Sequence, residues 1–234
     1  LGQLTYLLTY SNWSNPVNDP DANVDVVFGN SSNSFTEKSS GSGSFTVAAE
    51  SVDSSGNALS QLDPGDVCQS QITVDGGTTP IKVPIGAETL NIDLNDAHIR
   101  ADVQAPADLS AGGRVALANG EMGGYLTLEE VKDDMNTLSQ ACPCLQKDVF
   151  EINSSGDLRC TATQDDQDAC SSSPSAFCRE FLSIPQACGV AAGVVSGQAD
   201  IDSTPGDSNP DPDAISIGAT FTAAGAEITG TASQ

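Results

Sequence analysis

The sequence predicts a mainly β protein: a β-sandwich with an inserted cysteine-rich segment that contains two short helices. Three observations support this fold class. Residues 1–120 contain short segments rich in Val, Ile, Thr, Tyr and Phe, separated by clusters of Asn, Asp, Gly, Pro and Ser. After Gly124 the apolar residues take up helical spacing, and six of the seven cysteines lie there. Residues 214–223, AISIGATFTA, then alternate apolar and other side chains, as a half-buried strand does.

The predicted strands of the N-terminal half follow one another with no helical pattern between them. They are LTYLLTY (4–10), VDVVF (24–28), SFTVAAESV (44–52), QITVD (71–75), IKVPI (81–85) and TLNIDLNDAHIRADV (89–103). In the last segment the apolar positions change parity at Asn95–Asp96, which predicts a bulge or tight turn. We interpret SSGSGS, residues 39–44, as a hairpin loop, because strand patterns resume on both sides of it.

Two helices are predicted after the first strands. TLEEVKDDMNTL, residues 127–138, places four apolar residues on one face, and Thr127 and Glu130 match a capping box. We interpret the preceding NGEMGG as a glycine turn into this helix. A second helix is predicted in SSSPSAFCREFL, residues 171–182, where Ser173 can act as N-cap and the proline after it suits the first turn.

The order of these elements predicts one large domain with an insertion. Residues 1–120 supply the N-terminal part of the β-sandwich, and residues 121–190 form a helical segment that disulfides hold together. From Gly189 onward β structure is expected to return. Residues 191–234 then provide the C-terminal strands that complete the sandwich.

Cysteine usage predicts disulfides and an oxidising compartment. At least two disulfides are expected among six clustered residues: Cys142, Cys144, Cys160, Cys170, Cys178 and Cys188. Six cysteines allow 15 pairings, and Cys68 is left over. Zinc is disfavoured, because the CPC motif differs from the CxxC-like pairs of structural zinc sites.

The chain starts at Leu1 rather than Met, as after removal of an export signal or after trimming. The expected location is extracellular or at the cell surface.

The charge of the chain limits its partners. There are 32 acidic residues against 8 basic ones, a net charge of −24, and 23 of the acids are Asp. Asp favours turns and loops over helical faces, so we expect a solvated acidic surface. Such a surface repels nucleic acid backbones and anionic lipids, which predicts no nucleic acid partner. No apolar run approaches the roughly 20 residues of a membrane helix, so no membrane insertion is expected.

An acidic segment precedes the predicted strand 214–223. ADIDSTPGDSNPDPDAISIG, residues 199–218, carries five candidate metal ligands: Asp200, Asp202, Asp207, Asp211 and Asp213. Carboxylate oxygens at short spacing are the ligands that Ca²⁺ prefers, so Ca²⁺ is the candidate cofactor. The spacing lacks the register of an EF-hand, and a solvated turn is the favoured alternative, because clustered carboxylates repel one another. A linker is a further alternative.

Catalytic signatures are scarce in this sequence. The single histidine, His98, lies in a predicted strand, where a structural role is the usual explanation. There is no G-x-S-x-G or H-E-x-x-H motif. Paired carboxylates arise by chance among so many acids, so they do not indicate glycoside hydrolysis. We therefore predict that the protein is not an enzyme.

The N-terminal strand is a candidate for assembly between copies. In LGQLTYLLTY, residues 1–10, the face made by Leu4, Tyr6, Leu8 and Tyr10 is too apolar to remain in water. A terminal strand can join a sheet edge of its own domain or of a neighbouring subunit. The following SNWSNPVNDPDAN, residues 11–23, provides a long hinge rich in Asn, Pro and Asp. We expect self-association through Leu1–Tyr10, with an ordinary first strand as the alternative.

Three segments carry a resemblance to known proteins. They are VPIGAETLNIDLNDAHIRADV (83–103), GEMGGYLTLEEV (120–131) and DSNPDPDAISIGATFTA (207–223). In these segments the chain resembles uncharacterised exported β-rich proteins of myxobacterial type, over roughly its C-terminal two-thirds. The resemblance implies export and an order of elements: a strand pair, a Gly-Gly helix start, and an Asp-rich loop before a terminal strand. It implies no activity, and the cysteine-rich segment departs from the pattern.

These patterns lead to two main hypotheses about function. The first is a secreted structural or adhesive protein, a subunit of an extracellular filament or surface layer, that assembles through β-strand edges. The second is a calcium-dependent extracellular recognition module for carbohydrate, and an extracellular hydrolase is a weaker third. N-glycosylation sequons occur at Asn12, Asn30 and Asn153, and they matter only in a host that glycosylates.

Overall fold

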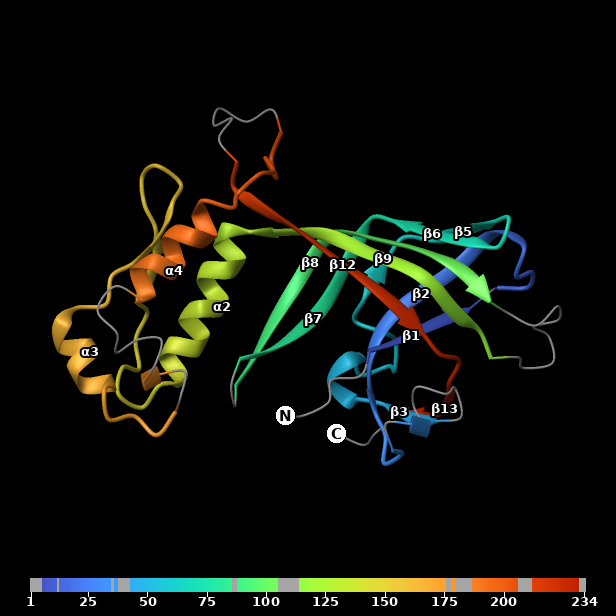
Figure 1. Ribbon diagram of the computed structural model, residues 1–234, viewed down its shortest axis with the longest axis horizontal. Helices are drawn as coiled ribbons and strands as arrows, with labels where there is room; N and C mark the ends of the chain where they lie inside the picture. Colours follow the sequence, from blue (N-terminus) through green and yellow to red (C-terminus); the bar gives the residue numbers. More distant parts are fainter. Residues whose placement is uncertain are drawn as a thin grey trace. The chain divides into compact units, whose positions relative to one another are not determined.

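The computed structural model describes residues 6–11, 13–34, 36–37, 43–85, 88–104, 114–175, 178–179, 187–205 and 212–231 (Figure 1). Its strands are β1 (Tyr6–Ser11), β2 (Asn18–Asn30), β3 (Ser44–Val47), β4 (Gln61–Leu62), β5 (Gly65–Cys68), β6 (Gln71–Asp75), β7 (Gly77–Ile85), β8 (Glu88–Gln104), β9 (Ala116–Thr127), β10 (Phe150–Ile152), β11 (Leu158–Cys160), β12 (Ala214–Ala223) and β13 (Glu227–Thr231). The helices are the 3₁₀ turn η1 (Ala49–Ser51), α2 (Leu128–Ala141), α3 (Gln164–Cys170) and α4 (Ala187–Ser196). The predicted class, mainly β with a disulfide-linked helical segment, is confirmed.

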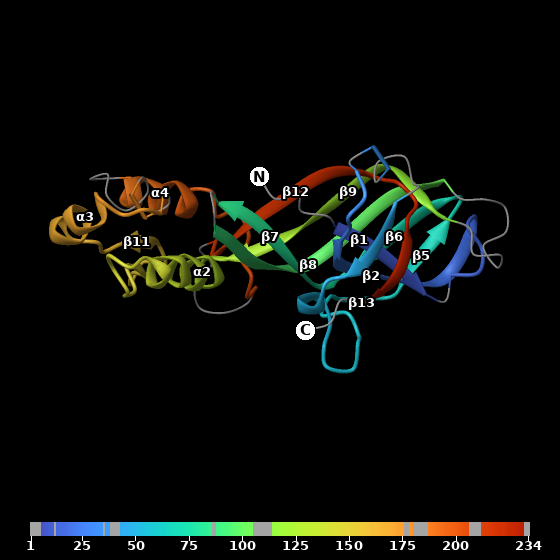
Figure 2. The same ribbon diagram turned by 90° about the horizontal axis from the view of Figure 1, so that it is seen from below.

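One large sheet contains most of the strands. Among the described residues it has eleven strands, eight of which follow the order β12-β9-β8-β6-β5-β2-β3-β13. β1 pairs with β2, and β7 pairs with β4 and β8. The last two strands both join earlier ones: β12 lies beside β9, as Figures 1 and 2 show, and β13 runs parallel to β3. A separate two-stranded sheet is formed by β10 and β11.

The chain forms two compact units. Unit 1 comprises Leu1–Pro80, Leu94–Gly124 and Gly218–Gln234, and unit 2 comprises Ile81–Asp93 and Tyr125–Ile217. These bounds differ from the predicted boundaries at residues 120 and 190, because residues 81–93 belong with the helical segment and that segment extends to residue 217. The strands β7, β8, β9 and β12 contribute residues to both units.

The expected return of β structure at Gly189 is wrong. Helix α4 spans Ala187–Ser196, and a long strand begins again only at Ala214. The sequence ACGVAAGVVS misleads because its Gly and Val residues are poor helix formers. Cys188 and Ala192 are both buried, and their spacing of four places them on one helical face against the core of unit 2. Tertiary packing therefore decides the conformation of this segment.

Unit 1 has its main core between residues that alternate along β2, β6 and β8. This core includes Val24, Val26, Ile72, Val74, Ile99 and Ala101. The predicted change of parity in β8 is confirmed. Leu94 and Ala97 are both buried, although an odd spacing of three would place them on opposite faces of a regular strand. Asp96, between them, has a φ of +45°. This local backbone conformation lets a single long strand keep its apolar side chains on the buried face before and after the irregularity.

The predicted glycine turn before α2 is wrong, because β9 continues through these glycines to Thr127. A Cβ on Gly120 would lie 2.7 Å from ring atoms of Phe221, and one on Gly124 would lie 2.6 Å from the carbonyl oxygen of Asn95. Since real Cβ atoms do not approach other atoms so closely, these glycines permit close packing within unit 1.

The start of α2 matches its prediction. The Thr127 hydroxyl accepts a hydrogen bond from the Glu130 N–H at 3.2 Å, and the Glu130 carboxylate accepts one from the Thr127 N–H at 2.9 Å. This reciprocal pair is the predicted capping box. On the predicted apolar face, Leu128 and Leu138 are buried, and Val131 and Met135 pack against the core of unit 2.

The second predicted helix falls mostly outside the described residues, which omit 176–177 and 180–186. Its expected N-cap, Ser173, is buried, and its hydroxyl accepts a hydrogen bond from the Ser175 N–H at 3.3 Å. Helix α3 was not predicted, because its sequence QDDQDAC has no apolar periodicity. A Thr163–Asp166 capping box fixes its first turn.

Asn136 on α2 ties this helix to β10. Its side chain is buried, donates to the Phe150 carbonyl (2.9 Å) and accepts from the N–H groups of Val149 (3.0 Å) and Phe150 (2.9 Å). Replacing Asn136 with Ala removes these three buried hydrogen bonds, so we expect the free energy of unfolding to fall by about 2–4 kcal/mol. Urea denaturation measures the change. A Gln140→Ala variant, at an exposed position on the same helix, should change it little; equal effects of the two substitutions would contradict this role.

Candidate functional site

An apolar groove in unit 1 is the main candidate site. Its volume is about 1340 Å³, a size ample for an extended peptide or a large apolar ligand. Its lining includes residues 6–10 of β1, residues 116–118 of β9, residues 221–223 of β12 and side chains of the main core. The Arg114–Glu227 ion pair, 3.2 Å between nitrogen and oxygen, lies on its lining.

Strand β1 borders this groove and pairs with its own chain. Its register with β2 runs from Tyr6 opposite Phe28 to Ser11 opposite Asn23. The expectation that the Leu and Tyr face is covered is met only in part: Tyr6 and Tyr10 are 36% and 38% exposed. Leu4 lies outside the described residues.

The other face of β1 is the one that becomes buried. Leu7 packs with Val27, Phe45 and Val47, and a Cβ on Gly29 would lie 2.7 Å from a methyl carbon of Leu7. The glycine therefore provides the space into which Leu7 fits. Sequence reasoning missed this anchor, because its pocket is formed by residues that are remote in the chain.

The connection after β1 is shorter and more ordered than the predicted hinge over residues 11–23, since β2 already begins at Asn18. Buried Asp19 accepts hydrogen bonds from the Ser14 N–H (2.7 Å), the Ser14 hydroxyl (2.9 Å) and the Asn15 N–H (3.1 Å). These bonds, chiefly those from Ser14, lower the pKa of Asp19 to about 2. The Trp13 indole N–H donates to the Asn15 carbonyl at 2.8 Å. The connection is thus a structured turn.

The acidic segment of unit 2 is closed by a short bridge between Ile201 and Ala214. Asp200, Asp202 and Asp213 lie on either side of this bridge. Asp207 and Asp211 fall in residues 206–211, outside the described part of the chain. The bridge thus brings the two ends of the acidic segment together.

The three described aspartates accept hydrogen bonds from their own chain. Asp200 accepts from the hydroxyl and N–H of Ser216, which lower its pKa. Asp213 accepts from the N–H (2.7 Å) and hydroxyl (2.9 Å) of Ser203. Asp202 accepts from the N–H of Thr204 at 3.0 Å. These contacts give each carboxylate a role in shaping the turn.

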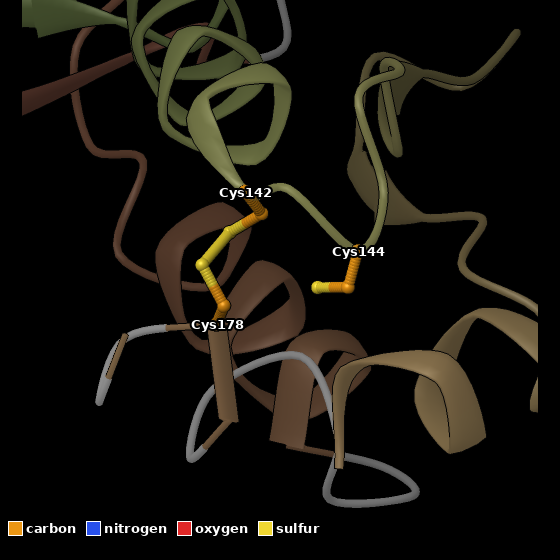
Figure 3. Close-up of side chains that lie close together, drawn as sticks. All are labelled: Cys142, Cys144 and Cys178. Atoms are coloured by element: carbon orange, nitrogen blue, oxygen red, sulfur yellow. A yellow bond between two sulfur atoms is a disulfide. The ribbon is translucent and has the colours of Figure 1, made fainter. Parts of the chain in front are cut away.

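Across the described ranges, only one trio of His, Cys, Asp or Glu side chains has ligand atoms within 4.8 Å of one another. It consists of Cys142, Cys144 and Cys178 (Figure 3). Asp200, Asp202 and Asp213 therefore do not converge on one point as they stand. His98 on β8 is exposed and belongs to no such trio within this part of the chain.

The prediction of at least two disulfides is confirmed. Three are formed, with Cα–Cα distances of 5.8, 5.2 and 5.7 Å: Cys142–Cys178, Cys144–Cys170 and Cys160–Cys188. Cys68 is free and exposed on β5. Sequence reasoning left the pairing open, and the fold selects it by bringing the end of α2 beside α3 and Cys178, and β11 beside α4.

A group of acidic side chains in unit 2 was not anticipated. Asp134 on α2 is half-buried, and its burial raises its pKa to about 6, with further contributions from Asp93, Glu130 and Asp133. Glu130 and Asp133 lie within about one helical turn of Asp134, so their proximity follows from the sequence. Asp93 on β8 is remote in the chain, and only the fold brings it close.

Comparison with known proteins gave no relatives: no family model, no curated protein and no solved structure matches the chain. Among the helices of the described residues, none has the length and apolar character needed to span a membrane.

Replacing Asp134 with Asn is expected to stabilise the protein at about pH 8. The folded-state pKa of about 6 lies above the ordinary 3.8, so protonation favours folding and the native protein loses stability as pH rises through this range. Because solvent screens a half-buried group, we expect the free energy of unfolding to rise by only about 1 kcal/mol. This increase disappears below about pH 4, where Asp134 is protonated in both the folded and the unfolded chain. Thermal unfolding across pH measures it. An exposed-site control, Asp165→Asn, should lack this pH dependence, and a gain independent of pH would contradict the explanation.

Proposed function

We propose that the protein is an extracellular structural or adhesive protein, a subunit of a filament or surface layer, that associates with further copies through β1. The observation that carries this proposal is the position of β1. In the described part of the chain it pairs with β2 alone, and it borders the apolar groove. Three disulfides support an oxidising, extracellular location, because such bonds persist there.

A second copy of the chain is the occupant that fits best. The β1 of a neighbour can reproduce the same six-residue register on β2 and place its Leu7 in the same pocket beside Gly29. Such exchange requires no new interface, since every contact already exists within one chain. The turn held by Asp19 is short, and short connections favour exchange when they open.

Charge also favours this segment as the contact. Two copies that each carry a net charge of −24 repel one another, whereas the sequence of β1, YLLTYS, contains no charged residue. An uncharged apolar strand can therefore approach an acidic surface with little Coulomb cost. Salt screens the repulsion between the acidic surfaces of the two copies outside β1. Association should therefore strengthen as ionic strength rises.

Deletion of residues 1–11 tests the role of β1. We expect the full chain to form oligomers at about 0.5 M salt, and the truncated chain to remain folded, stay monomeric and bind a synthetic LGQLTYLLTYS peptide. A peptide with Leu7→Asp should bind at least about tenfold more weakly, because it places a charge in an apolar pocket, while a Thr9→Ser peptide serves as the matched control. Native mass spectrometry measures mass and binding. Assembly that survives the deletion would contradict the proposal.

Cysteine trapping gives an answer even if the truncated chain does not fold. Thr9 lies opposite Asp25 in the β1–β2 register. In a Cys68→Ser background, chains with Thr9→Cys are mixed with chains with Asp25→Cys and then oxidised. Strand exchange predicts a disulfide-linked heterodimer. A mixture that stays unlinked, while a chain with both substitutions closes its own disulfide, would show that β1 remains within its own chain.

The second candidate is a calcium-dependent recognition module. The observation in its favour is the Ile201–Ala214 bridge, which brings Asp200, Asp202 and Asp213 to the base of one acidic loop. This candidate predicts that millimolar Ca²⁺ raises the unfolding midpoint by several degrees, and that an Asp207→Asn, Asp211→Asn double variant abolishes the rise. Thermal unfolding with Ca²⁺ and with Mg²⁺ distinguishes the candidates. An unchanged midpoint would favour the structural role of these aspartates.

A further inference from the structure

The sulfur atoms of two disulfides gather in one place in unit 2. The Sγ atoms of Cys142, Cys144 and Cys178 all lie within 4.8 Å of one another. Figure 3 shows the Cys144 sulfur pointing toward the Cys142–Cys178 bridge. The fourth sulfur, that of Cys170, is bonded to Cys144 but lies outside this group of three. We propose that, once these two disulfides are reduced, the four cysteines form a tetrathiolate site for Zn²⁺.

The spacing of the sulfurs suits this metal. Four thiolates at about 2.3 Å from a tetrahedral Zn²⁺ lie about 3.8 Å from one another. The three sulfurs that already lie within 4.8 Å of one another need to move by only about an ångström to reach this geometry, and the Cys170 sulfur, which starts outside this group, has to move further. The CPC motif alone did not predict a zinc site, because its spacing is unusual and the other two ligands come from remote segments.

Non-covalent contacts position Cys142 and Cys144, the two cysteines of the CPC motif. The Cys142 carbonyl accepts hydrogen bonds from the N–H groups of Leu145 (3.0 Å) and Gln146 (3.1 Å), which form a tight turn around Cys144. The Ser139 hydroxyl donates to the Lys147 carbonyl at 2.9 Å and so fastens the end of this turn to α2. None of these hydrogen bonds involves a disulfide sulfur.

Similar contacts position Cys170 and Cys178. Lys147 forms an ion pair with Asp166 of α3, at 2.7 Å, which connects the CPC turn to the helix that carries Cys170. The Cys170 carbonyl accepts from the Ser173 N–H at 3.0 Å. Arg179, next to Cys178, donates to the Ser173 carbonyl at 3.2 Å. Reduction therefore leaves a partly pre-organised group of four thiols.

The environment favours a metal thiolate over free thiols. Cys142, Cys170 and Cys178 are buried, in a core that also contains Val149 and Phe150, so water competes poorly for the metal. A tetrathiolate Zn²⁺ centre carries a net charge of −2. Two of the eight basic residues of the chain lie close in sequence to these cysteines: Arg179 follows Cys178, and Lys147, three residues after Cys144, pairs with Asp166.

The chemistry balances with an external dithiol as reductant. Each protein disulfide takes up two electrons and two protons to give two thiols, and the dithiol becomes a disulfide. Binding of Zn²⁺ then displaces four protons from the four thiols. The third disulfide, Cys160–Cys188, joins β11 to α4 and takes no part.

Cobalt is a suitable probe, because tetrahedral thiolate-bound Co²⁺ has intense charge-transfer absorption that Zn²⁺ lacks. In a Cys68→Ser background, the protein is reduced, desalted without oxygen and titrated with Co²⁺. We expect one Co²⁺ per chain with a tetrathiolate spectrum, displaced by Zn²⁺, and no such spectrum in the oxidised protein. A Cys144→Ser, Cys170→Ser double variant should lose at least about tenfold in affinity, while a Cys160→Ser, Cys188→Ser control should bind as the parent does.

If the reduced chain loses structure, circular dichroism during the titration measures whether metal binding restores its helices. Recovery of helical signal together with the cobalt spectrum supports the site, because metal binding is then coupled to folding. The proposal is overturned if the reduced chain binds no Co²⁺, if the Cys144→Ser, Cys170→Ser variant binds it as tightly as the parent, or if metal binds without restoring structure that reduction has removed.

Discussion

The three disulfides are the constraint on which unit 2 depends. The segment between Cys142 and Cys188 is rich in Ser and Asp and has few large apolar side chains, so burial alone supports it weakly. Its bridges join residues 36, 26 and 28 positions apart, and closing loops of this length contributes about 3–4 kcal/mol each by restricting the unfolded chain. The buried sulfurs also fill the core against which α2 packs. The cysteines are therefore both cross-links and core residues.

Unit 1 is held in a different way, by pairing between segments that are remote in sequence. The C-terminal β12 lies beside β9, and β13 runs parallel to β3. Phe221 on β12 is half-buried above the space that Gly120 leaves, whereas residues 217–220 are exposed. The apolar faces of β1 and β12 are thus only partly covered, which is why a groove lies between them. The same incomplete cover makes β1 the best candidate for contact with another copy.

Local patterns in the sequence predicted local structure well. The Thr127–Glu130 capping box and the change of parity at Asp96 depend on neighbouring residues, and both are present. Features that depend on remote contacts were not predictable from one sequence: the helical state of residues 187–196, the pocket for Leu7 and the disulfide pairing. At the candidate sites, composition identified the acidic segment and the N-terminal strand. It could not indicate that Ser203 and Ser216 already occupy the carboxylates of Asp213 and Asp200.

The division of the chain has a consequence for the order in which the protein is made. Unit 1 is discontinuous: its last segment, Gly218–Gln234, follows the whole of unit 2 in the chain. During synthesis from the N-terminus, all six paired cysteines therefore emerge before β12 and β13. Unit 2 can thus complete its oxidative folding while unit 1 still lacks two of its strands. Until those strands arrive, β3 and β9 each present an open edge, and a chaperone that covers such edges would act in this interval.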